Sequence, residues 1–177
     1  MIAAASRPDP AATEPPEVSF LARTAIGLLT GSGQTVAVAE SLTGGLVTGA
    51  LTSIAGASVV VRGGVVAYAT ELKSALLGVP DDLLAARGPV DPDVAVEMAA
   101  GVRRLLGASY GVATTGVAGP GPADGKPQGT VFVAVAGLSE TFCEELELAG
   151  GDRQQVRDGT VRWALSLLVR ALREDAS

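Results

Sequence analysis

Apolar residues recur along the chain at two different spacings, which predict an alternation of helices and strands. Helical spacing, with apolar residues three or four positions apart, predicts helices over 17–31, 44–53, 70–77, 91–106 and 152–172. Short apolar runs typical of buried strands cover 35–39, 59–69, 110–115 and 130–136, with a bend expected at 62–64. Apolar residues alternate with acidic ones over 142–148, which indicates a strand at the edge of a sheet.

The order of these elements predicts the fold class. Strands alternate with helices in the first part of the chain, and two neighbouring strands form a hairpin in the later part. This order is typical of a layered α/β protein with a mixed sheet, in which ligands bind at the carboxyl ends of strands. We expect one domain over residues 17–177. Residues 1–16 are rich in Pro, Ala and acidic side chains, so we expect a disordered tail there.

Charge and residue types narrow the chemistry that this chain can perform. The formal net charge is −6 and no cluster of Lys and Arg offsets it, which argues against nucleic acid as the main partner. The chain has no histidine and one cysteine, so a Ser-His-Asp triad, a Cys-His pair and a His-ligated zinc site are excluded. No apolar run has the length of a membrane span, no signal peptide is evident, and the single cysteine suits a reducing cytoplasm. A hydrolase with this composition must use Lys, Asp, Glu or Tyr as its base.

A serine lies where the first predicted strand gives way to a helix. Ser41 is expected at the helix N-terminus, where unpaired N–H groups stabilise an anion. Thr43, Gly44 and Gly45 follow it, and the glycines let a ligand approach the backbone closely. This arrangement suits a serine nucleophile with an oxyanion hole formed around 43–45. The alternative is a side chain that merely caps the helix.

A tyrosine and a lysine follow the second predicted strand. Tyr68 lies near the strand end, and Thr70 is expected to cap the next helix, which places Lys73 in its first turn. The helix dipole there favours the neutral amine and lowers the pKa of Lys73, as a lysine base requires. The alternative is an ordinary solvated lysine on the surface.

Two further segments have the composition of an anion site. Residues 114–130 join two apolar strands and combine Gly and Pro with Thr and Lys, which suits a phosphate cradle, although a plain surface loop is the alternative. Asp152 is a good N-cap for the last helix, and Arg153 beside it has the reach to bind a phosphate or carboxylate. The alternative there is a plain helix cap followed by a solvated arginine. The phosphate-binding residues that we predict are Thr115, Gly116, Gly119 and Arg153.

Seven short motifs, taken in order, resemble the C-terminal domain of CinA proteins over about residues 18–172. They are Ala39-Glu40-Ser41-x-Thr43-Gly44-Gly45, Ile54-Ala55-Gly56-x-Ser58, Arg62-Gly63, Tyr68-x-x-x-x-Lys73, Gly116-x-Ala118-Gly119-Pro120, Lys126-Pro127-x-Gly129-Thr130-Val131 and Gly151-Asp152-Arg153. The resemblance implies a three-layer α/β/α domain that hydrolyses nicotinamide mononucleotide to nicotinate mononucleotide and ammonia, without metal or cofactor. It also implies a serine nucleophile that works with a lysine and a tyrosine, which by motif are Ser41, Lys73 and Tyr68.

Two other functions stay open at this point. A chain of this type is also suited to bind a nucleotide without turnover, or to act as a serine amidase on a different amide. The presence of Ser41, Lys73 and Tyr68 together favours an enzyme. The partner that we expect is a small nucleotide substrate rather than nucleic acid or a membrane, and the Ala- and Val-rich helices leave a homo-oligomer open.

Overall fold

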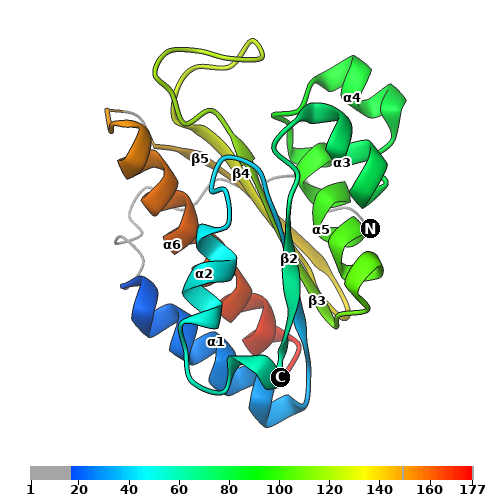
Figure 1. The fold of residues 1–177 in the computed structure, drawn as a ribbon, viewed down its shortest axis with the longest axis vertical. Helices are drawn as coiled ribbons and strands as arrows, with labels where there is room; N and C mark the ends of the chain where they lie inside the picture. The colour runs from blue at the N-terminus through cyan, green and yellow to red at the C-terminus, as the bar shows by residue number, and fades with distance from the viewer. Residues whose placement is uncertain (1–16, 149, 177) are drawn as a thin grey trace.

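The computed structural model describes residues 17–148 and 150–176, and Figure 1 shows their arrangement. Five strands form one mixed sheet in the order β2-β1-β3-β4-β5. The strands are β1 (Val36–Glu40), β2 (Val61–Val66), β3 (Tyr110–Gly116), β4 (Thr130–Ala136) and β5 (Thr141–Glu147). β1 pairs in parallel with β2 and β3, whereas β4 pairs antiparallel with β3 and β5. The predicted α/β class with a mixed sheet is confirmed, and the predicted tail over 1–16 lies outside the described residues.

Helices cover both faces of the sheet and give the structure three layers (Figure 1). One face carries α1 (Val18–Ser32), α2 (Leu46–Thr52) and α6 (Arg153–Glu174), and the other carries α3 (Thr70–Leu77), α4 (Asp81–Arg87) and α5 (Pro92–Leu106). A short 3-10 turn, η1 (Ala57–Val59), precedes β2. Sequence pattern does not predict α4, because this helix has seven residues and none of them is buried. Among the described residues, no helix combines the length and apolarity needed to cross a membrane.

Two separate cores follow from the alternation of side chains along the central strands. On β1, Val36 and Val38 point into the core beneath α1, α2 and α6, whereas Ala37 and Ala39 point into the core beneath α3 and α5. The alternation continues past the strand end, so that successive side chains after Ala39 face opposite layers. Small residues let α5 approach the sheet closely: a Cβ atom on Gly111 would lie 2.0 Å from the carbonyl oxygen of Ala99.

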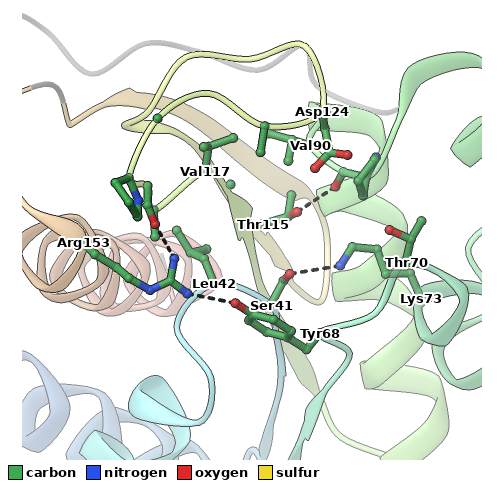
Figure 2. A pocket seen from close by; sticks show the side chains of 17 residues that line it. Ser41, Leu42, Tyr68, Thr70, Lys73, Val90, Thr115, Val117, Asp124 and Arg153 are labelled. Atoms are coloured by element: carbon green, nitrogen blue, oxygen red, sulfur yellow. Dashed lines mark hydrogen bonds between the residues drawn. The ribbon is translucent and has the colours of Figure 1, made fainter.

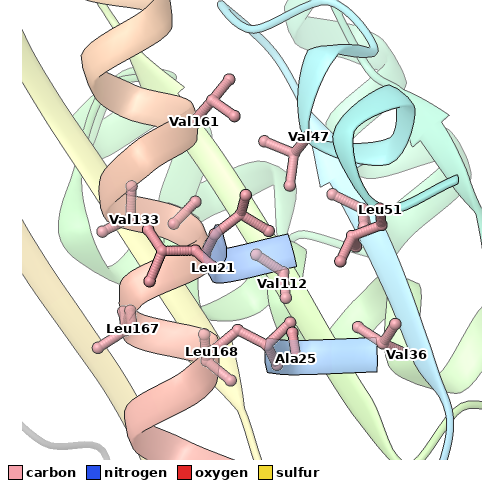
Figure 3. Close-up of a cluster of buried hydrophobic side chains, with 14 of the residues drawn as sticks. Leu21, Ala25, Val36, Val47, Leu51, Val112, Val133, Val161, Leu167 and Leu168 are labelled. Atoms are coloured by element: carbon pink, nitrogen blue, oxygen red, sulfur yellow. The ribbon is translucent and has the colours of Figure 1, made fainter. Parts of the chain in front are cut away.

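The core beneath α1, α2 and α6 is built from aliphatic side chains (Figure 3). Those labelled in the figure are Leu21 and Ala25 of α1, Val47 and Leu51 of α2, Val161, Leu167 and Leu168 of α6, and Val36, Val112 and Val133 of the sheet. Burying one Val or Leu side chain fully stabilises the fold by about 1.5–3 kcal/mol. This layer therefore fixes α2 and α6 firmly against the strands whose ends carry the polar residues.

The element boundaries differ from the predicted ones where glycine forces a left-handed turn. α2 begins at Leu46 rather than at residue 44, because Gly44 and Gly45 have φ values of 59° and 100°. α1 continues past residue 31 to Ser32, and Gly33, whose φ is 67°, is its C-cap. β2 is a single strand, and the expected bend at 62–64 coincides with a shift in its register against β1 at Arg62. The predicted N-cap of α6 is confirmed, since Asp152 accepts a backbone N–H there, and Asp91 caps α5 in the same way.

Candidate active site

Ser41 comes directly after β1, beside the carboxyl ends of the parallel strands. Its N–H donates to the carbonyl oxygen of Thr114 at 3.0 Å, so the backbone keeps strand geometry up to this residue. Side chains alternate along a strand, which turns Glu40 toward α2 and Ser41 toward α3. Lys73 of α3 donates from Nζ to Ser41 Oγ at 3.1 Å (Figure 2). The structure therefore brings together the serine and the lysine that the sequence analysis singles out.

Lys73 is a buried lysine, with 1 % of its surface exposed. Its Nζ also donates to the carbonyl oxygen of Ala67 at 2.9 Å. Burial lowers the pKa of Lys73 from 10.5 to about 8, and the negative charge of Asp124 acts in the opposite direction. The helix N-cap is Ala69 rather than Thr70, so the expected cap is wrong. Desolvation, rather than the helix dipole, is the main cause of the low pKa.

In the turn between β1 and α2, two of the N–H groups expected to form an oxyanion hole donate hydrogen bonds within the protein. The N–H of Gly44 donates to the carbonyl oxygen of Ser41 at 3.1 Å, and the N–H of Gly45 donates to Glu40 Oε2 at 2.9 Å. Both groups already have acceptors inside the protein and are not open to an oxyanion. The glycines instead supply the left-handed turn, and Thr43 remains as an expected oxyanion donor beside the serine.

Glu40 caps the start of α2 from inside the core. Its side chain is fully buried and its two carboxylate oxygens accept four hydrogen bonds. The donors are the N–H groups of Gly45, Val47 and Thr48 and the hydroxyl of Thr48, at 2.7–3.1 Å. A negative side chain at a helix N-terminus satisfies the unpaired N–H groups there and is favoured by the helix dipole. Glu40 thus fixes α2 to the end of β1.

Tyr68 stands at the mouth of the site and contacts an arginine rather than the serine–lysine pair. Its side chain is 60 % exposed, and its hydroxyl accepts a hydrogen bond from Arg153 Nη2 at 2.9 Å (Figure 2). Arg153 Nη1 donates to the carbonyl oxygen of Gly119. Among the hydrogen bonds of the described residues, none joins the Tyr68 hydroxyl to Ser41 or Lys73. The expected contact of Tyr68 with this pair is therefore absent here, and the tyrosine belongs to the wall that holds Arg153.

A pocket of about 230 Å³ opens over Ser41 and Lys73 (Figure 2). Its lining includes Ser41, Leu42, Tyr68, Thr70, Lys73, Val90, Thr115, Gly116, Val117, Gly119, Asp124 and Arg153. All four predicted phosphate-binding residues are in this set. Two of them are also structural: Thr115 Oγ1 donates to the carbonyl oxygen of Pro89 at 2.7 Å, and Gly116 pairs with Val131 of β4. The described residues contain no group of three or more His, Cys, Asp or Glu side chains suited to a metal ion.

Comparison with protein-family models decides the relationship of this chain to known proteins. The model of the CinA C-terminal domain matches residues 18–172. The chain belongs to this family. A CinA-like protein from Frankia casuarinae is 52 % identical over 147 residues, which cover 83 % of this chain and 34 % of the relative. A putative competence-damage inducible protein from Desulforamulus reducens is 47 % identical over 140 residues, 79 % of this chain and 34 % of that protein. The chain thus spans about a third of the length of the curated relatives it matches.

Solved structures of CinA-type proteins have the same fold. A competence/damage inducible protein from Agrobacterium tumefaciens is 38 % identical, with a TM-score of 0.85 over 90 % of this chain and 98 % of that one. A competence or damage-inducible protein from Enterobacter asburiae is 32 % identical, with a TM-score of 0.85 over 89 % and 99 % of the two chains. The layered α/β arrangement is therefore shared across this family.

Sequence pattern predicts no function for three residues that the structure places at this CinA-type site. Asp124 lies in the glycine-rich loop and faces the pocket, and Glu40 caps α2. Arg157 of α6 donates from Nε to the carbonyl oxygen of Leu42 at 3.0 Å and from Nη2 to that of Thr43 at 3.1 Å. Glu40 lies inside a motif that the sequence shows, so its position was a usable signal. Arg157 lies in the second turn of a long helical pattern, and nothing in the pattern marks a long-range contact.

Proposed function

We propose that this CinA-type domain is a metal-independent serine amidohydrolase that converts nicotinamide mononucleotide to nicotinate mononucleotide and ammonia. One observation carries the proposal: Lys73 Nζ lies 3.1 Å from Ser41 Oγ at a pocket, and burial lowers the pKa of Lys73 to about 8. A nucleophile paired with a base of this pKa is the arrangement that covalent catalysis near neutral pH requires. The choice of substrate rests on the resemblance of the motifs to the family.

Hydrolysis begins with proton transfer from Ser41 to Lys73. The neutral amine of Lys73 keeps its N–H bond to the carbonyl oxygen of Ala67, 2.9 Å away, and its lone pair accepts the Ser41 proton. Ser41 Oγ then bonds to the carboxamide carbon, and the carbonyl electrons move to oxygen to give a tetrahedral oxyanion. The carbon–nitrogen bond breaks as Lys73 returns the proton to nitrogen, which leaves ammonia and an acyl-enzyme. A water molecule, deprotonated by Lys73, releases the carboxylate and restores Ser41.

The other side of the pocket is suited to the phosphate of a mononucleotide. Arg153 is held by Tyr68 and by the carbonyl oxygen of Gly119, so its guanidinium is positioned at the pocket wall before substrate binds. A planar guanidinium makes strong charge-assisted hydrogen bonds to phosphate oxygens. Thr115 and Gly116 line the same pocket. We assign phosphate binding to Arg153 and the adjoining loop, with Tyr68 orienting Arg153, and we expect the enzyme in the cytoplasm.

An ammonia-release assay tests this proposal. The protein is incubated with nicotinamide mononucleotide, with nicotinamide riboside, which lacks the phosphate, and with unrelated amides. We expect ammonia from the mononucleotide, little from the riboside, and an unchanged rate with a metal chelator. We expect Ser41→Ala and Lys73→Ala to lower kcat by several orders of magnitude, and their double variant to be little worse, because the two residues act as a unit.

Three results would each contradict a different part of the proposal. Ammonia release from another amide but not from the mononucleotide would make the chain an amidase with a different substrate. Tight nucleotide binding with no turnover by the unmodified protein would make it a binding protein. Normal kcat in Ser41→Ala would require direct attack by water instead of an acyl-enzyme.

A further inference from the structure

The chain segment after Ser41 is held by a guanidinium group from the last helix. Arg157 donates from Nε to the carbonyl oxygen of Leu42 at 3.0 Å and from Nη2 to that of Thr43 at 3.1 Å. Its Nη1 donates to the side-chain oxygen of Gln154 at 2.9 Å, which fixes the plane of the guanidinium. Two successive backbone carbonyl groups therefore point toward one side chain.

The direction of these carbonyl groups sets the direction of the amide groups beside Ser41. In a trans peptide unit the N–H and C=O bonds point in opposite directions, so the N–H groups of Thr43 and Gly44 point away from Arg157. The N–H of Gly44 donates to the carbonyl oxygen of Ser41 at 3.1 Å, so an N–H group that points away from Arg157 points toward Ser41. The N–H of Thr43 has the same direction one residue closer to Ser41.

Two of the amide groups in this turn have no acceptor among the residues that the structure describes. Within residues 17–148 and 150–176, no hydrogen bond uses the N–H of Leu42 or Thr43. Thr43 is fully buried, and its side chain is fixed by a hydrogen bond of 2.8 Å to the hydroxyl of Thr114. Leaving a buried backbone donor unpaired costs about 1–3 kcal/mol, so these groups usually have an acceptor in the working state. The residue after a nucleophilic serine commonly supplies such a donor to the reacting oxygen.

We propose that the N–H groups of Leu42 and Thr43 form the oxyanion hole and that Arg157 is the positioning residue that aims the N–H of Thr43. The N–H of Leu42 belongs to the peptide unit of the Ser41 carbonyl, which accepts the N–H of Gly44. This inference rests on the proposed serine chemistry at Ser41, and it replaces Gly44 and Gly45, whose N–H groups are occupied. Arg157 binds the carbonyl side of these peptide groups, opposite to the side on which the N–H of Thr43 lies, so it acts through the backbone rather than by touching substrate. Glu40 holds the far side of the same turn through Gly45, so the peptide groups between the two contacts are fixed before substrate arrives.

The proposal predicts loss of kcat without loss of binding when Arg157 is changed. Arg157→Met keeps an unbranched apolar stem and removes both donors, while Arg157→Lys keeps the charge but offers a point donor instead of a planar fork. Removing one oxyanion donor lowers kcat by about 10²–10³-fold in well-studied hydrolases, and we expect a loss of that order for Arg157→Met. KM for nicotinamide mononucleotide should change less than about threefold, because a lost oxyanion contact affects the transition state alone. Added guanidinium chloride at millimolar concentration should restore part of the kcat of Arg157→Ala, since Arg157 is only half-buried.

A matched control lies on the same helix. Arg170 pairs with Glu144 at 2.6 Å and lies about 20 Å along α6 from Arg157, at 1.5 Å per residue. Arg170→Met should lower the unfolding midpoint and leave kcat unchanged. Unchanged kcat in Arg157→Met, or a KM rise that matches the kcat loss, or no rescue by guanidinium, would overturn the role of Arg157.

A second measurement separates failure of this inference from failure of the proposed function. A fluorophosphonate reacts with an activated serine: the Ser41 Oγ–phosphorus bond forms, fluoride leaves with the bonding electrons, and Lys73 takes the serine proton. This reaction needs the same oxyanion donors but no amide substrate. If the unmodified protein releases no ammonia but is labelled at Ser41, the substrate proposal fails, and equal labelling rates in Arg157→Met would then reject the inference as well. If Ser41 is not labelled and no ammonia appears, both proposals fall.

Discussion

Lys73 becomes a base through removal of water rather than through a cationic neighbour. It is 1 % exposed, and desolvation is the leading cause that lowers its pKa to about 8. Asp124 is the group that opposes this shift, so the loop that carries Asp124 tunes the proton affinity of Lys73 from across the pocket. A base whose pKa lies near the working pH is largely in its neutral form and still has a high affinity for the proton that it accepts.

The first prediction concerns the pH dependence of turnover. Because Lys73 acts as a base in its neutral form, kcat/KM should rise with pH up to a plateau, with an apparent pKa of about 8 in the free enzyme. Removing the opposing charge in Asp124→Asn should move the rising part of the pH profile to lower pH. Steady-state ammonia release between pH 6 and 10 measures both profiles, with Lys126→Met as the control at the chain's other lysine. A flat profile would exclude Lys73 as the base.

The second prediction concerns stability. The folded-state pKa of Lys73 lies below its unfolded value of 10.5, so the unfolded chain binds the proton more tightly. The resulting cost to stability, about 3 kcal/mol at 1.36 kcal/mol per pKa unit, is fully present below pH 8. It disappears between pH 8 and 10.5, where stability rises with pH. Urea unfolding should show this rise in the unmodified protein and not in Lys73→Met, and equal slopes in the two proteins would contradict it.

At the scale of elements, the junction between β1 and α2 organises the site. The end of β1 sends Ser41 to one face and Glu40 to the other, and Glu40 then anchors α2 by four hydrogen bonds. Sequence pattern predicts this strand and helix because both have clear apolar periods and glycines between them. It does not predict where α2 begins, since a helix boundary depends on the φ values of Gly44 and Gly45.

The third prediction concerns Glu40. A glutamine in its place keeps the shape but presents one NH₂ group toward N–H donors, so at least one donor is left without an acceptor. Hydrogen bonds to a charged group contribute about 1.5–3 kcal/mol each, so Glu40→Gln should lower the free energy of unfolding by roughly 2–4 kcal/mol. Urea unfolding measures the loss, and Glu71→Gln on the exposed side of α3 is the control. A loss under about 0.5 kcal/mol, as for an ordinary surface change, would argue against the anchoring role.

At the scale of the whole molecule, the pocket is assembled from parts that are distant in sequence. Arg153 at the start of α6 contacts Tyr68 after β2 and Gly119 in the loop after β3. The resemblance of the motifs to the family predicts that Ser41 and Lys73 belong to one site, and the sequence predicts Arg153 as a ligand of the substrate phosphate. It does not predict that Tyr68 bonds Arg153, because this contact depends on how the elements pack, which no local pattern records.

The fourth prediction separates phosphate binding from chemistry. Arg153→Ala removes a charge-assisted contact, so KM for nicotinamide mononucleotide should rise by about 10–100-fold, as expected for 1.5–3 kcal/mol. KM for nicotinamide riboside should stay within about twofold of the unmodified protein, because that substrate has no phosphate. Tyr68→Phe should cause a smaller rise, since it removes one support of Arg153. Equal effects on both substrates would remove Arg153 from the phosphate site.

The lysine of the proposed pair is attached to the edge of the sheet, and this has a consequence for how activity is lost. Among the described strands β2 is an outer one that pairs with β1 alone, and the carbonyl oxygen of Ala67 that holds Lys73 follows it directly. Edge segments open locally at a lower free energy than the centre of a fold. Local unfolding of β2 and of the segment after it would separate Lys73 from Ser41 while β3, β4 and α6 remain in place. In a urea titration, turnover should therefore disappear before the fluorescence of Trp163 on α6 changes. Coincident midpoints would show that β2 and the rest of the sheet unfold as one unit.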